Sequence, residues 1–158
     1  MGRRTLFATF FGYVAALSLW VVLSVQSPLP VGGFAIITPQ DGVIVVGDGD
    51  IASYNAISHE LILTGECVER IRGMKGFLEG SFAITVDGEE VLSGIFVPPI
   101  ISRSYPSTQV VIVYPTFDSN YDVMRIQMGY PWGEPVGQDP RDDPRIAQYF
   151  EATGRLIS

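Results

Sequence analysis

The feature that most constrains this chain is a long run without charge near its N-terminus. From Leu6 to Val25 there are twenty residues, and none of them is Asp, Glu, Lys or Arg. At a rise of about 1.5 Å per residue, this run forms a helix of roughly 30 Å, the thickness of a bilayer's hydrocarbon core. The sequence therefore predicts a transmembrane helix over residues 6–25, with the lipid bilayer as its partner.

The charges around this run predict its orientation. Arg3 and Arg4 precede it, and the next positive side chain is Arg70. Positive residues favour the cytoplasmic side, so we expect the N-terminus in the cytoplasm and the rest of the chain across the membrane. The predicted protein is thus a single-pass protein of the cell membrane.

A cleaved signal peptide is the alternative to a retained anchor. Its apolar region is about 7–15 residues long and ends at a site with small residues. The run here is longer, and it exits through Ser-Val-Gln-Ser-Pro at residues 24–28. We expect an anchor at residues 1–27, a Pro/Gly linker at 28–33 and an extracytoplasmic domain at 34–158. Cleavage would deliver that domain to the same side.

The domain pattern predicts an α+β fold: a compact, mostly antiparallel sheet with two short helices. Short apolar and β-branched runs alternate with turn residues, and they do not alternate regularly with helical segments. We expect strands at residues 34–38, 43–46, 51–54, 60–63, 82–86, 91–97, 109–114 and 123–128, with a loop at 100–107. One helix is expected at 66–72, capped by Thr64. A second begins at Asp143-Pro144 and ends near Gly154. Residues 129–144 hold too much Pro and Gly for regular structure.

The strongest turn signal is Asp87-Gly88, which predicts a hairpin between the strands at 82–86 and 91–97. A two-residue and a three-residue loop put different faces of these strands inward, so the sequence leaves their register open.

Composition excludes some function classes. Beyond the two N-terminal arginines, the chain carries 17 acidic and eight basic side chains. Such an acidic domain repels phosphate backbones, so nucleic acid is not expected as a partner. Cys67 is the single cysteine, which excludes an internal disulfide and leaves no Cys cluster for zinc. No cofactor is predicted.

A local resemblance supports the same location. Its residues are the run from Tyr54 through Ser-His-Glu-Leu-Ile-Leu-Thr at 58–64, the short helix, and the hairpin from Phe82 through Asp87-Gly88 to Phe96. This order resembles uncharacterised single-pass prokaryotic envelope proteins. Locally it is also similar to the periplasmic head of the protein-export component SecD, in which a capped helix precedes an apolar strand and an Asp-Gly hairpin. The resemblance covers about a third of the chain and implies fold and location, not functional residues.

His59 is the candidate catalytic residue. It is the only histidine and thus the only side chain whose unperturbed pKa lies near neutrality. A general base needs a nucleophile and an orienting acid, and the neighbouring Ser58 and Glu60 are expected to point away from His59 in an extended strand. The sequence favours a surface or capping histidine. Convergence of His59 with two acids in a deep pocket would favour a hydrolase.

Two acidic groups are candidates for a cation site. Asp48 and Asp50 flank Gly49, and hard cations bind several carboxylates and carbonyls. The EF-hand pattern is not present, because Ala52 and Ser53 occupy the positions where that loop has Asp or Asn and then Gly. A second group contains Asp139, Asp142 and Asp143, with arginines interleaved. Ion pairs and a helix cap are the favoured interpretation there, and metal is the alternative at both places.

Aromatic residues beside prolines predict a binding surface. Tyr130 and Trp132 flank Pro131, and Tyr105 precedes Pro106. Rigid aromatic side chains give a large contact area at low entropic cost. The alternative is that these rings cover the core under a long loop.

These observations favour a non-enzymatic module that binds a membrane or envelope protein as part of an envelope complex. The alternatives are a hydrolase that uses carboxylates with His59 and a cation-binding sensory domain. Enzymatic activity is left open by the sequence.

Overall fold

The computed structural model describes residues 32–158 except 75–77, 99–100, 115–120 and 132. The predicted anchor at residues 6–25 lies outside this part of the chain. Within the part described, no helix is both long and apolar enough to cross a bilayer.

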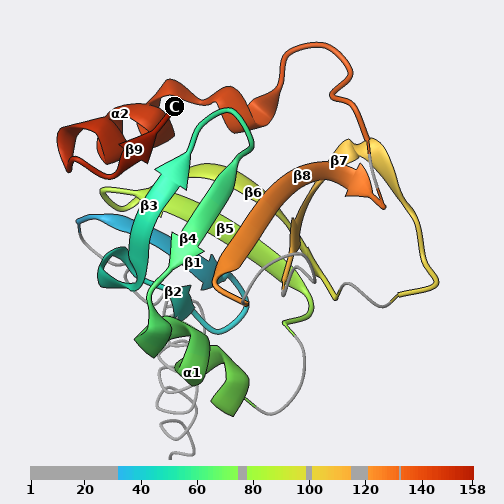
Figure 1. Cartoon of the computed structure of the whole chain (residues 1–158). Helices are drawn as coiled ribbons and strands as arrows, with labels where there is room; N and C mark the ends of the chain where they lie inside the picture. Colours follow the sequence, from blue (N-terminus) through green and yellow to red (C-terminus); the bar gives the residue numbers. More distant parts are fainter. Residues whose placement is uncertain (1–31, 75–77, 99–100, 115–120, 132) are drawn as a thin grey trace, which may run out of the picture.

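The described residues of the domain form one nine-stranded sheet with two helices, which confirms the predicted α+β fold (Figure 1). The strands are β1 (Phe34–Thr38), β2 (Val43–Val46), β3 (Ile51–Asn55), β4 (Glu60–Leu63), β5 (Ser81–Val86), β6 (Glu89–Val97), β7 (Tyr105–Val113), β8 (Val123–Tyr130) and β9 (Leu156–Ile157). Their order in the sheet is β2-β1-β5-β6-β7-β8-β4-β3-β9. Neighbours are antiparallel except for the parallel pairs β6–β7 and β3–β9. The helices are α1 (Gly65–Gly73) and α2 (Pro144–Ala152), and two 3₁₀ turns, η1 (Asp48–Asp50) and η2 (Pro140–Asp142), complete the fold.

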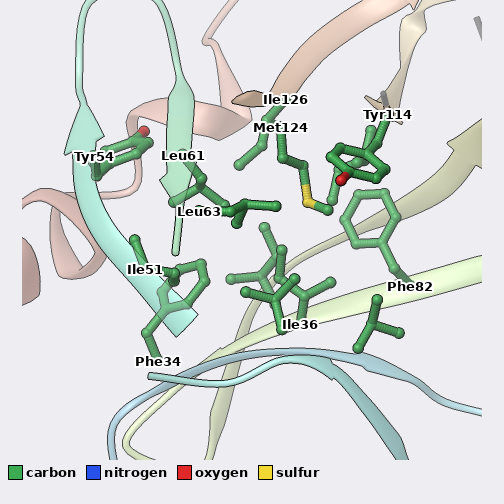
Figure 2. Close-up of a cluster of buried hydrophobic side chains, with 14 of the residues drawn as sticks. Phe34, Ile36, Ile51, Tyr54, Leu61, Leu63, Phe82, Tyr114, Met124 and Ile126 are labelled. Carbon is green, nitrogen blue, oxygen red and sulfur yellow. The ribbon is translucent and has the colours of Figure 1, made fainter. Parts of the chain in front are cut away.

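One face of the sheet closes on the main hydrophobic core. Figure 2 shows side chains from strands far apart in the sequence meeting there, with Tyr54 at the rim of the drawn cluster. From α2, Phe150 packs its ring 5.0 Å from those of both Phe34 and Tyr54. From α1, Cys67, Val68 and Ile71 are buried in the same core, as their helical spacing predicts.

Local signals at the helix ends are confirmed. The Thr64 side chain accepts a hydrogen bond from the Cys67 amide at the start of α1, and Asp143 caps α2 in the same way. At the end of α2, Gly154 has φ of +69° and its amide bonds to the Glu151 carbonyl. The next amide reaches back to Phe150, which completes a Schellman motif.

The structure resolves the hairpin register that the sequence left open. Val86 pairs with Glu89, so the connection is the two-residue loop Asp87-Gly88. Both loop residues have positive φ, +49° and +82°, as a type I′ turn requires. β6 therefore begins at Glu89, two residues before the predicted start.

Two further boundary predictions were wrong. Residues 105–107, predicted as loop, belong to β7, where Tyr105 pairs with Tyr130. A register shift between Tyr105 and Val110 interrupts the alternation by which the sequence reveals a strand. Residues 129–144, predicted to lack regular structure, contain the end of β8 and the turn η2. Neighbouring strands and an Asp cap supply hydrogen bonds that composition does not reveal.

Candidate functional site

The turn between β3 and β4 holds His59 in a fixed position. The Asn55 side chain accepts hydrogen bonds from the amides of Ile57 and Ser58, which forms a compact turn. His59 then adopts φ of +53°, and its carbonyl accepts the amide of Ile126 on β8 at 3.0 Å. These contacts fold the imidazole inward, so that the residue is only 6% exposed.

The two nitrogens of the His59 ring face different surroundings. Nδ1 lies 3.1 Å from the hydroxyl of Tyr54, a buried residue of β3. Nε2 lies 3.7 Å from Oδ1 of Asp142 and 3.9 Å from Oδ2 of Asp139. Both separations exceed hydrogen-bond length. The structure thus brings the candidate His59 together with two acids that the sequence places in another group.

The 3₁₀ turn η2 explains why both acids face His59. Asp139 caps this turn and Asp142 is its last residue, and side chains three residues apart in a 3₁₀ helix lie above one another. Figure 1 shows the β3–β4 turn beside this segment, which leads into α2. The Arg141 guanidinium binds both oxygens of Asp139, at 2.6 Å for Nη2–Oδ2. It also donates to the Ile126 carbonyl, so Ile126 holds both halves of the cluster.

Electrostatics favour a neutral imidazole beside an ionised carboxylate. Burial, together with the positive charge of Arg141, lowers the pKa of His59, although the two aspartates oppose this shift. Hydrogen bonds from Arg141 lower the pKa of Asp139. Burial raises the pKa of Tyr54 to about 12, so its hydroxyl stays protonated. Near neutral pH the cluster therefore offers an imidazole and carboxylate oxygens as electron-pair donors.

The neighbours of His59 in sequence do not form a catalytic set with it. The Ser58 hydroxyl donates to Glu60 at 2.9 Å, and Glu60 also pairs with Arg125 at 2.8 Å. The hydroxyl of Tyr54 lies 3.1 Å from Nδ1 of His59. Two acids lie beside His59, and the deep pocket that the hydrolase hypothesis also requires stays a prediction, as does the hypothesis itself.

The other candidate cation ligands, Asp48 and Asp50, are engaged by arginines. Asp48 accepts hydrogen bonds from Tyr149 at 2.6 Å and from Arg155 at 2.5 Å. Asp50 forms a two-pronged pair with Arg70, at 2.6 and 2.8 Å. Each carboxylate thus neutralises a guanidinium, which is the role of structural ion pairs.

Tyr105 and Tyr130, two of the predicted binding residues, come together as cross-strand partners. Both are partly buried and pack on a second small core of Val97, Val111 and Val113. This arrangement favours the alternative in which they cover hydrophobic residues. Trp132 lies outside the described residues.

Exposed apolar residues occur elsewhere. On β2, Val43 and Ile44 are 46% and 45% exposed, and in the β3–β4 turn Ile57 is 78% exposed. Sequence reasoning did not single out β2 as a surface. The available signal was the run of four β-branched residues in β2, which follows a tight turn. Such a run indicates a strand, but it does not show whether another strand covers its edge.

Comparisons of the chain with protein-family models, with curated proteins and with solved structures found no match. The site must therefore be interpreted from its own geometry.

Proposed function

We propose that this chain is a single-pass membrane-anchored protein whose extracytoplasmic domain binds another membrane or envelope protein. The observation that carries the proposal is the exposed end of β2, where Val43 and Ile44 leave apolar surface beside strand edge. The uncharged residues 6–25 supply the anchor.

The position of β2 favours strand addition. β2 is the terminal strand of the sheet order, and its partner among the described strands is β1. Consecutive strand residues point to opposite faces, so exposure of both Val43 and Ile44 means that neither face is covered there. Arg70 of α1 donates to the Val45 carbonyl at 3.1 Å and so protects only the inner part of the edge. An extended apolar segment of a partner fits the rest.

Anchoring strengthens such an interaction. A tether of a few residues confines the domain near the membrane and raises its effective concentration toward a membrane-bound partner. The acidic body is repelled by anionic head groups, which keeps the edge available.

The proposal is tested by photo-crosslinking in native membranes. A photoreactive amino acid replaces Ile44 in the full-length chain, and the matched control carries it in place of Ile57, which is more exposed but lies in a turn. We expect an adduct with a different protein from position 44 and none from position 57. The substitution Ile44→Lys should abolish capture of that protein, because a charge on an edge opposes strand pairing, whereas Ile57→Lys should preserve it.

Two results contradict this function. Equal crosslinking from both positions, or an adduct only with a second copy of the chain, excludes a specific partner at β2. Recovery of the native protein in the cytosolic fraction, or resistance of the domain to protease added to sealed cells, excludes the anchor and its orientation.

A further inference from the structure

We propose that His59, Asp139 and Asp142 form a binding site for a divalent first-row transition-metal ion. The ligands are Nε2 of His59, Oδ2 of Asp139 and Oδ1 of Asp142, which lie within 4.8 Å of one another. The site is independent of partner binding at β2, since none of its ligands belongs to that strand.

The separations between Nε2 of His59 and the two carboxylates fit a coordination shell. Nitrogen and oxygen ligands lie about 2.0–2.2 Å from zinc, so two ligands of one ion are roughly 3–4 Å apart, depending on the angle between them. The distances from Nε2 to the two aspartates, 3.9 and 3.7 Å, fall in this range. The Asp142 side chain is 66% exposed and sits at the end of a short turn, so it can move inward to tighten the site.

A second observation is the state of the buried imidazole. Among the described residues, Nε2 of His59 has no hydrogen-bond partner, although the residue is only 6% exposed. The Nε2 nitrogen is therefore available to a ligand, and it faces a gap between two carboxylates, at 3.7 and 3.9 Å from their nearest oxygens. A cation in that gap satisfies the nitrogen lone pair and both negative charges.

The surroundings of the three ligands match those of metal sites. Metal-bound histidines donate their second ring N–H to a neighbouring oxygen, and Tyr54 places its hydroxyl 3.1 Å from Nδ1. Ligating carboxylates are likewise held by hydrogen bonds, as Arg141 holds Asp139. Oδ2 of Asp139 accepts hydrogen bonds from both Nη2 and Nε of Arg141, at 2.6 and 3.1 Å, so a bound ion would share this oxygen with the guanidinium.

The mixed donor set selects the class of ion. Imidazole suits zinc, copper, iron and nickel, whereas calcium takes six to eight oxygens. One nitrogen and two carboxylates therefore favour a transition ion over calcium, and a three-ligand site leaves room for water.

Isothermal titration of the full-length protein in detergent, purified without a histidine tag and stripped by a chelator, tests the site. We expect saturable binding of one Zn²⁺ per chain, which an excess of Ca²⁺ does not displace. Asp142→Asn and His59→Gln should each weaken Zn²⁺ binding by at least about tenfold, since even supporting residues of metal sites contribute 10–100-fold. Glu151→Gln, which changes an exposed carboxylate on α2, should bind as the unaltered protein does.

The substitution Tyr54→Phe distinguishes coordination of the ion by His59 from simple attraction of the ion to nearby negative charge. Removing the hydroxyl leaves every ligand in place, so a loss of about tenfold or more supports a histidine oriented for metal binding. The proposal is overturned if no saturable Zn²⁺ binding occurs, or if Asp142→Asn and His59→Gln bind Zn²⁺ as Glu151→Gln does. Because Asp142 is exposed, Asp142→Asn should keep the fold, so its Zn²⁺ affinity tests the site even if His59→Gln unfolds.

Discussion

Two aspartates lie near each end of β3, but their surroundings differ. Before β3, Asp48 and Asp50 are each bound by an arginine, Arg155 and Arg70. After β3, the imidazole of His59 shares a gap with two carboxylates and makes no hydrogen bond to either. The sequence offers both groups as cation candidates, and the structure distinguishes them.

The difference lies in what satisfies each carboxylate. A guanidinium fills the positions that a cation would take and ties distant segments together, since Arg155 and Arg70 come from the C-terminal segment and α1. At the other end, the one arginine holds Asp139 and leaves Nε2 and Asp142 facing each other. Asp139 is thus paired with an arginine as Asp48 and Asp50 are, and what sets this end apart is Nε2 of His59, which lies 3.7 Å from the exposed Asp142 carboxylate.

The largest expected effect on stability is at the start of β3, the paired end, where arginines bind Asp48 and Asp50. Arg155→Ala removes hydrogen bonds to the carbonyls of Asp48 and Ile51 and the bond to the Asp48 carboxylate. Leaving these partly buried acceptors unpaired should lower the free energy of unfolding by about 3 kcal/mol. Urea unfolding of the full-length protein in detergent measures it, with the exposed Arg103→Ala as control. A loss no larger than that of the control would show that the pairing is incidental.

Arg70→Ala should have a smaller effect, a loss of about 1 kcal/mol. Its pair with Asp50 is partly solvated and contributes little, so most of the change comes from the Val45 carbonyl. Because this bond protects β2, the variant should also self-associate more readily, which light scattering detects. Unchanged stability and unchanged scattering together would remove Arg70 from both roles.

Acid should weaken the paired end. Burial opposes ionisation of Asp48, but hydrogen bonds from Arg155 and Tyr149 outweigh it and lower its pKa, and Arg70 lowers the pKa of Asp50. A lowered folded-state pKa stabilises the fold above the unfolded value of about 3.9, and this stability is lost as pH falls through the folded value. Unfolding free energy should therefore decline below about pH 4, and less steeply in Arg155→Ala. Parallel profiles would contradict the pairing.

The smallest effect on stability is expected at the other end of β3, the open end, where His59 lies beside Asp139 and Asp142. Without metal, Asp142→Asn should change the free energy of unfolding by less than about 0.5 kcal/mol, because the side chain is exposed. With saturating Zn²⁺, the unaltered protein should gain thermal stability and the variant should gain much less. A large loss without metal would place Asp142 among the structural residues and blur the contrast between the two ends.

The sequence predicted those parts of the fold that depend on neighbouring residues. The bounds of β1, β2 and β4 are confirmed, as are the caps Thr64 and Asp143. Periodicity and capping act over a few residues, so they are legible in the chain itself. Prediction failed at residues 105–107, where a register shift and a distant partner strand determine the structure.

The candidate site lay beyond sequence reasoning for the same reason. His59 and the aspartate group were each identified, but nothing in the sequence indicates that a turn 80 residues earlier packs against η2. The bonds of Ile126 to the His59 carbonyl and to Arg141 produce that meeting, and they exist only once β4 pairs with β8.

The sequence alone determined the kind of domain, because burial of alternating apolar side chains and local capping require no distant partner. Tertiary structure alone decided that Arg155 and Arg70 pair with Asp48 and Asp50, and that Asp139 and Asp142 lie beside His59. That choice depends on angstrom-scale distances between segments far apart in the chain, and electrostatic interactions fall off over those distances.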